Sequence, residues 1–227
     1  MKLIVAIPAY NEASIIGSVI ERIPSTLPGI REILMLVIDD GSTDATAQIA
    51  EAAGALVLSH PLNGGVGVAK VTGFTVARQL NADITVTMDA DGQHDPANLT
   101  TLIAPIISGE ADIAAGTRLK DPTGMPTIRL LGNRTMNALL RIVWGVKTTD
   151  SQSGYRAYSR ESLEHLEIEA SGFEVDTEIL IAARRNNLAV VEIPVRTIYT
   201  NYSKTKGQSV STALMTFFRL IKQVITG

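Results

Sequence analysis

Short apolar runs alternate with amphipathic stretches along the first hundred residues, and this alternation restricts the fold more than any other feature. Runs rich in β-branched residues and apolar on both faces, which are typical of buried strands, occupy 3–7, 33–38, 55–58 and 84–88. Stretches with apolar residues at helical spacing lie between or after them, at 15–23, 44–53 and 66–80. The pattern predicts an α/β fold with a mostly parallel sheet flanked by helices. Farther along, helices are predicted over 128–144 and 173–183 and a strand over 189–195.

Polar or glycine-rich segments follow the predicted strands. These segments are Tyr10-Asn11-Glu12, Asp39-Asp40, Asn63-Gly64-Gly65 and Asp89-Ala90-Asp91. Parallel strands end at the same edge of a sheet, and ligands of such sheets bind there. The sequence therefore predicts a ligand site along the carboxyl edge of the sheet.

Charge and composition exclude several classes of protein. The 227 residues carry a net charge of −3, which lacks the basic excess of a nucleic-acid-binding protein. The chain has no cysteine, so disulfide scaffolds, thiolate metal sites and cysteine nucleophiles are excluded. No segment reaches the roughly 18 consecutive apolar residues of a membrane-spanning helix. We therefore expect a soluble main body.

The strongest chemical signal is the cluster that begins at Asp89. Asp89 and Asp91 are alternate residues that leave a buried strand, so both carboxylates can reach one hard cation, with Gln93 beside them. Mg²⁺ or Mn²⁺ held in this way takes one or two carboxylates and completes its shell with diphosphate oxygens. An acidic turn is the alternative for an isolated pair, but the other polar strand ends favour the metal site.

Two further segments leave alternatives open. The glycine-rich stretch 63–70 fails both the Walker and the dinucleotide patterns, so it either faces a ligand or only turns the chain. Asp39 and Asp40 precede a helix that Ser42 or Thr43 can cap, yet a carboxylate there can also accept a hydrogen bond from a ring N–H of uracil or guanine. The three histidines show no metal-ligand spacing, and we assign them no role.

An ordered set of motifs resembles the family-two glycosyltransferases, and among them the polyprenyl-phosphate (dolichyl-phosphate) sugar synthases. The motifs begin at Pro8, Asp39, Asp89, Gly116, Gly132, Asp150 and Glu192, and cover nearly the whole chain. The resemblance implies a fold of the glycosyltransferase A type and inversion at the anomeric carbon. It implies a catalytic domain over 1–208, followed by an amphipathic helix over 209–227.

The resemblance also assigns roles residue by residue. The nucleotide-binding positions are Pro8, Tyr10, Asn11, Glu12, Asp39, Asp40, Asp89 and Ala90. The positions implied for Mg²⁺ or Mn²⁺ are Asp89, Asp91 and Gln93. Those implied for the acceptor phosphate are Arg118, Arg129, Arg134 and Lys206, of which Lys206 replaces arginines found in many members and cannot grip a phosphate bidentately. Asp91, Arg118 and Glu178 are the implied catalytic residues.

These positions imply transfer of a sugar from a UDP- or GDP-linked donor to a polyprenyl or dolichyl phosphate. A lipid phosphate is already anionic, whereas a hydroxyl acceptor needs a general base, for which Glu178 or Asp176 are the candidates. A phosphohydrolase of the haloacid-dehalogenase type would use Asp89 as nucleophile, but it leaves 8–12 and 39–44 unexplained. A sugar nucleotidyltransferase and a catalytically silent nucleotide-binding module are further alternatives.

The last predicted helix, 210–225, has one apolar face that includes Phe217 and Phe218. With Lys204, Lys206, Arg219 and Lys222 nearby, it suits a helix in the interface of an anionic membrane, although packing on the core is the commoner fate. We expect a cytoplasmic protein bound peripherally to the membrane. The sequence leaves its oligomeric state open.

Overall fold

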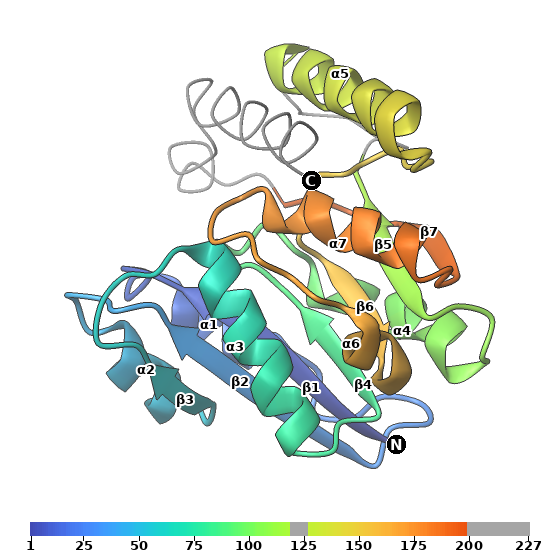
Figure 1. The fold of residues 1–227 in the computed structure, drawn as a ribbon. Coiled ribbons are helices and arrows are strands. Elements are labelled where there is room, and N and C mark those ends of the chain that lie inside the picture. The colour runs from blue at the N-terminus through green and yellow to red at the C-terminus, as the bar shows by residue number, and fades with distance from the viewer. Residues whose placement is uncertain (119–126, 199–227) are drawn as a thin grey trace.

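The computed structural model describes residues 1–118 and 127–198, and a 7-stranded sheet within these ranges forms the centre of the molecule (Figure 1). The strands lie in the order β3-β2-β1-β4-β6-β5-β7. Their bounds are β1 Lys2–Ala9, β2 Glu32–Asp39, β3 Leu56–Ser59, β4 Ile84–Thr87, β5 Ile113–Thr117, β6 Arg156–Ser159 and β7 Val190–Pro194. The pairings are parallel except those of β6, which runs antiparallel to both β4 and β5.

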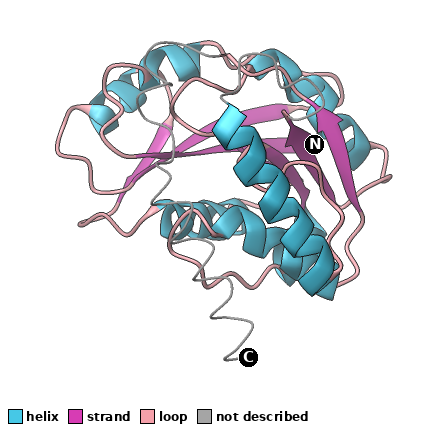
Figure 2. Cartoon of the chain, turned by 90° about the horizontal axis from the view of Figure 1, so that it is seen from above, coloured by secondary structure: helices cyan, strands magenta, loops and turns pink. Residues whose placement is uncertain are grey.

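Helices cover both faces of this sheet (Figure 2). They are α1 Ile16–Glu21, α2 Thr46–Ala52, α3 Val66–Gln79, α4 Leu99–Ile107, α5 Thr127–Trp144, α6 Arg160–His165 and α7 Val175–Arg185, with a short 3₁₀ turn, η1, at Pro96–Asn98. Successive residues of a strand point to opposite faces, so β1 supplies Leu3, Val5 and Ile7 to one core and Ile4 and Ala6 to the other. The first core includes α1, α2 and α4, and the second includes α3, α6 and α7.

Helix α5 packs outside these two layers. A third, small cluster joins it to α7 through Met136, Leu140, Leu180 and Ile181. The outer side of α5 is exposed, with 67% of Leu131 and 82% of Ile142 accessible to solvent. Within the described residues, no helix is both long and apolar enough to span a membrane.

The predicted α/β fold is confirmed, and each predicted strand and helix within the described residues has a counterpart. Five elements were not predicted from the sequence: α4, α6, the short turn η1, the strand β5 and the antiparallel strand β6. The predicted helix over 210–225 and the residue Lys206 lie outside the described residues, as does the boundary proposed between 208 and 209.

Candidate functional site

The site lies where β4 ends and β6 begins. Thr87, the last residue of β4, is paired with Arg156, the first residue of β6. Because β6 runs antiparallel, the loop that enters it reaches the same sheet edge as the loop that leaves β4. The hydroxyl of Thr87 donates a 2.7 Å hydrogen bond to the carbonyl oxygen of Gly154 and joins the two loops. Asp89 therefore meets Gly154 at the carboxyl edge, as the strand-end argument predicts.

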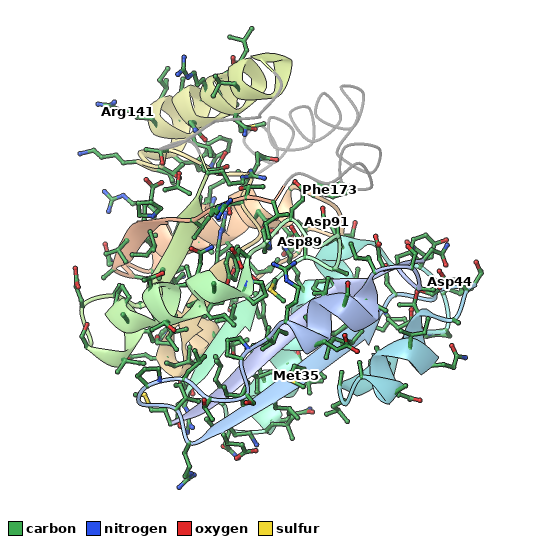
Figure 3. All side chains as sticks on the ribbon, turned by 180° about the vertical axis from the view of Figure 1, so that it is seen from behind. Met35, Asp44, Asp89, Asp91, Arg141 and Phe173 are labelled. Carbon is green, nitrogen blue, oxygen red and sulfur yellow. The ribbon has the colours of Figure 1, made fainter. Side chains whose placement is uncertain are left out.

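Asp89 projects from this edge with 39% of its side-chain surface exposed (Figure 3). Burial by the surrounding protein raises the pKa of its carboxyl group, but the electrostatic influence of His94, Lys70 and Arg118 outweighs burial and holds the pKa below its ordinary value. The backbone N–H of Asp89 donates to Nδ1 of His94, whose ring stacks on Tyr155 with centroids 4.8 Å apart. Asp89 is thus an oriented, negatively charged group.

Asp91 lies on the same loop, and its pKa is shifted in the opposite direction from that of Asp89. Burial, followed by the negative charge of Asp89, raises the pKa of Asp91. Its carboxylate accepts hydrogen bonds from the backbone N–H of Gln93, at 3.0 Å, and from the side-chain amide of Gln93. The structure therefore brings all three predicted metal positions together in one turn.

These three residues fit a divalent cation that a diphosphate shares. Two neighbouring carboxylates repel one another, and a hard cation relieves that repulsion. In the part of the chain that the structure describes, no group of three or more His, Asp or Glu side chains forms a closed metal cage. Mg²⁺ and Mn²⁺ bound by one or two carboxylates need no such cage when substrate phosphates supply the other ligands.

The loops after β1 and β2 form the next part of the edge. Asn11, at a φ of 53°, donates from its backbone N–H to the hydroxyl of Ser42 and accepts from the backbone N–H of Thr43 through its side-chain oxygen. Asp39 is paired in register with Ala9 and accepts a hydrogen bond from Ser42 through Oδ1. The structure thus places Asn11 beside the Asp39 loop, as a nucleoside pocket requires.

Asp40 has a different environment from its neighbour Asp39. Both residues are buried, but only the two carboxylate oxygens of Asp40 accept hydrogen bonds from the backbone N–H groups of Gly64 and Gly65, at 3.0 and 2.8 Å. Nδ1 of His60 lies 2.7 Å from Oδ1 of Asp40. In this structure the carboxylate of Asp40 holds the glycine-rich loop, whereas that of Asp39 accepts a hydrogen bond from the backbone of Ser42.

Contacts within the protein favour one of the two interpretations of the glycine-rich stretch 63–70, namely that it turns the chain. A Cβ on Gly65 or Gly67 would lie 2.4 Å from the carbonyl oxygen of Ser171 and 2.1 Å from that of Ala170, respectively. The backbone N–H of Gly67 donates to Ser171. The glycines therefore allow close packing of the backbone of α3 on the 170–171 segment, and their N–H groups are used within the protein.

Arg118, the predicted acceptor arginine, is held by Asp150. Nε and Nη2 of Arg118 donate to the two oxygens of Asp150 at 2.8 and 2.9 Å, and the backbone N–H of Arg118 donates to Asp150 as well. Glu192 supports the neighbouring loop by accepting hydrogen bonds from Thr148 and Thr149. The guanidinium group of Arg118 is thereby fixed at the end of β5.

The two acids considered as general bases both have partners inside the protein. Asp176 accepts hydrogen bonds from the buried ammonium group of Lys70 at 2.7 and 2.9 Å. Glu178 accepts from the backbone N–H groups of Glu169 and Ala170 at 3.1 and 2.7 Å. In this structure both carboxylates hold protein segments in place.

The remaining predicted positions are spread along the same edge and on α5. Pro8 is buried in β1, Ala90 is buried next to Asp89, and the backbone N–H of buried Glu12 donates to Thr46. Tyr10 is 44% exposed. Arg134 is exposed on α5. The side chain of Arg129 lies outside the described residues.

Several residues at the site were not assigned a role from the sequence. They are His60, His94, Lys70, Asp150 and Gly154. His94 follows Asp89 by only five residues on the loop that leaves β4, and this short spacing favours the contact between them. Lys70 is the only charged residue between Val66 and Ala77 in α3, and a lone lysine in such a place indicates a buried partner.

Comparisons with known proteins agree with this site. The model of glycosyl transferase family 2 matches residues 4–167. A UDP-N-acetylglucosamine–dolichyl-phosphate N-acetylglucosaminyltransferase of Methanococcus voltae is 35% identical over 95% of this chain and 93% of its own length. A polyprenol monophosphomannose synthase of Mycolicibacterium smegmatis is 33% identical over 86% of this chain and 76% of its own length.

A solved structure supports the same assignment. Glucosyl-3-phosphoglycerate synthase of Mycobacterium tuberculosis, crystallised with Mn²⁺, UDP-glucose and phosphoglyceric acid, superposes with a TM-score of 0.76 and 25% identity. The match covers 98% of this chain and 79% of that one. The phosphohydrolase alternative is thereby set aside, because the family match includes the segments at 8–12 and 39–44 that it left unexplained. With the order of its motifs, the geometry of its sheet edge and these matches, the chain belongs to glycosyl transferase family 2.

Proposed function

We propose that the protein transfers a sugar from a UDP- or GDP-linked donor to a polyprenyl phosphate, with Mg²⁺ or Mn²⁺ as cofactor and inversion at the anomeric carbon. The relatives from Methanococcus and Mycolicibacterium are named for products or acceptors of this lipid-phosphate class. The structural neighbour was crystallised with a UDP-sugar and Mn²⁺. The residues at the carboxyl edge support each step of the proposal.

The nucleoside is held at the ends of β1 and β2. Asp39 offers a carboxylate to a ring N–H of uracil or guanine, while Asn11 fixes the loop beside it through Ser42 and Thr43. Tyr10 is exposed next to this loop and supplies an aromatic surface for a base. Asp40 contributes indirectly, because its carboxylate holds the neighbouring glycine-rich loop.

The donor diphosphate lies at the end of β4. Asp89 and Asp91, with Gln93, would hold the divalent cation, which when bound stabilises the negative charge of the departing diphosphate. His94 keeps the Asp89 loop in place, because its Nδ1 accepts a hydrogen bond from the backbone N–H of Asp89. This hydrogen bond and the one from the Gln93 backbone to Asp91 orient the carboxylates before the donor arrives.

One observation supports the acceptor class more than the others: the carboxylates of Asp176 and Glu178 are both bound within the protein. A hydroxyl acceptor needs a general base to take its proton, and these two acids are bound to Lys70 and to backbone N–H groups. A phosphate monoester is already anionic and attacks without a base. The described contacts therefore favour a phosphate acceptor.

The acceptor phosphate is expected near Arg118, whose guanidinium group Asp150 holds in a bidentate pair. This pair limits the rotation of Arg118 and leaves its side chain 18% exposed. Arg134, on the exposed side of α5, is a second cation for the acceptor. Arg129 and Lys206 remain sequence predictions.

We also propose peripheral contact with the cytoplasmic face of the membrane. Leu131, Ile142 and Val143 are exposed apolar residues of α5, and the exposed Arg134 and Arg141 lie on the same helix. Apolar side chains next to cations suit an interface with anionic headgroups. The helix predicted over 210–225 lies outside the described residues and remains a separate sequence prediction of membrane contact.

Acceptor competition tests the function. The protein is incubated with a panel of UDP- and GDP-sugars and Mn²⁺, together with polyprenyl phosphate, the uncharged polyprenol or phosphoglyceric acid. We expect a glycolipid from polyprenyl phosphate alone. Transfer to polyprenol would refute the phosphate requirement, and transfer to phosphoglyceric acid without any glycolipid would refute the lipid acceptor.

A further inference from the structure

A buried ion pair lies behind the donor site, and its positive member has no role in the function described so far beyond binding Asp176. Lys70, on α3, is only 1% exposed, and its ammonium group contacts both carboxylate oxygens of Asp176 on α7. A buried lysine is rare because removing its charge from water is costly. The packing of α3 on α7 could be achieved with an apolar side chain, so the position of this charge calls for an explanation.

Gly154 shows how close this charge lies to the donor site. A Cβ on Gly154 would lie 3.0 Å from Nζ of Lys70 and 2.7 and 2.9 Å from the two carboxylate oxygens of Asp89. The ammonium group and the carboxylate thus both lie within 3.0 Å of one point, and no more than about 6 Å separates them. Because residue 154 has no side chain, nothing from this residue stands between them.

Arg156 adds a second buried cation to the same cluster. It is fully buried and donates to the backbone oxygens of Asp176 and Ser151. The described contacts of its guanidinium group therefore include no carboxylate. Lys70 and Arg156 together carry two positive charges, Asp176 carries one negative charge, and Asp89 supplies the second.

We propose that Lys70 is a positioning residue of the donor site, whose ammonium group holds the Asp89 carboxylate and weakens the site for a divalent cation that arrives without the donor diphosphate. This inference rests on the metal site of the proposed function. A positive charge at most about 6 Å behind a metal-binding carboxylate repels a second cation in front of it. The negative charge of a diphosphate offsets that repulsion, so metal and donor bind together more favourably than the metal binds alone.

The charge model predicts opposite effects for the two members of the ion pair. Lys70→Met/Asp176→Asn removes both buried charges without leaving either one unpaired, and it removes the cation that lies next to Asp89. Mn²⁺ alone should then bind severalfold more tightly, because Nζ of Lys70 is among the atoms next to Asp89 at Gly154, whereas the carboxylate removed with it is not. Asp176→Asn leaves Lys70 without its neutralising partner, so Mn²⁺ alone should bind severalfold more weakly.

The experiment measures the Kd of Mn²⁺ by electron paramagnetic resonance, with and without UDP, and records thermal unfolding of each variant. Lys147→Met, at an exposed lysine after α5, serves as the matched control and should leave both values unchanged. We also expect UDP to strengthen Mn²⁺ binding less in the double variant than in the wild type. If Asp176→Asn fails to fold, the double variant alone decides.

The outcomes separate this inference from the proposed function. Tighter Mn²⁺ binding by the double variant supports the charge model, and weaker binding by Asp176→Asn supports it further. A role in folding alone would leave Mn²⁺ affinity unchanged or weaken it in both variants, and either result overturns the inference while the metal site stands. Failure of the wild type to bind Mn²⁺ even with UDP would refute the metal site itself.

Discussion

Replacing Gly154 with alanine should push Asp89 out of its position. The new Cβ would lie 2.7 Å from Oδ1 of Asp89, whereas ordinary contact begins at 3.4 Å, so the carboxylate must retreat by about 0.7 Å. Residue 154 cannot move freely away from Asp89, because Nζ of the buried Lys70 would lie 3.0 Å from the same Cβ. Misplacement of a reacting group by about 1 Å can lower a rate by roughly 10²-fold. We expect kcat to fall by about one to two orders of magnitude.

The effect on stability should be smaller than the effect on kcat. Overpacking of a core costs about 1–3 kcal/mol, and the partly exposed Asp89 can yield toward solvent, so the lower end of this range is expected. At roughly 2–4 °C per kcal/mol for a chain of this size, Tm should fall by a few degrees. Thermal unfolding and a Mn²⁺ titration of kcat measure the two effects separately.

Gly132→Ala is the matched control for this substitution. Gly132 lies in α5, and a Cβ there would have no heavy atom within 4 Å. The same chemical change should therefore raise stability by up to about 1 kcal/mol, through helix propensity, and leave the Mn²⁺ dependence unchanged. A Gly154→Ala variant with the kcat and Mn²⁺ requirement of the wild type would refute the placement of Asp89 against Gly154.

The metal, the acceptor and the membrane contact each have a test of their own. Asp91→Ala should abolish transfer with a wild-type unfolding curve, and excess chelator should do the same to the unmodified enzyme; full turnover in chelator would exclude the metal. Arg118→Lys breaks the bidentate pair with Asp150. It should raise KM for the lipid phosphate at least tenfold, while nucleotide affinity, measured by calorimetry, stays nearly constant. Equal losses in both quantities would argue against an acceptor role. Ile142→Glu with Val143→Glu should abolish flotation with anionic vesicles but preserve UDP binding, whereas unchanged flotation would place the membrane contact elsewhere.

The sequence predicts the strands and helices well where side-chain periodicity decides them. The runs that became β1, β2 and β4 are apolar on both faces because helices cover both sides of the sheet. Strand β6 was missed because its four residues, Arg156–Ser159, include a buried arginine and show no apolar run. Its direction depends on pairing with β4 and β5, which periodicity does not encode.

Residue type alone does not show which acids are available to a ligand. Asp39 and Asp40 are adjacent and identical in type, yet Gly64 and Gly65 reach Asp40 alone. Glu178 matches a recurrent acid of the family, but it holds the backbone at 169–170. These distinctions depend on contacts between residues up to 25 positions apart, and a local motif carries no information on such contacts.

Because β6 is antiparallel, residues from two segments that are far apart in the sequence meet at the candidate site. In an all-parallel sheet, the residues that follow a strand would line the carboxyl edge, and those that precede it would lie at the opposite edge. Reversal of β6 exchanges these ends, so the residues before Arg156 meet the residues after Thr87. Gly154 can thus lie next to both Asp89 and Lys70, and Asp150 can reach Arg118 at the end of β5. The segment 150–155 therefore lies against Asp89 of the proposed donor site near one end and pairs with Arg118, the proposed acceptor arginine, at the other.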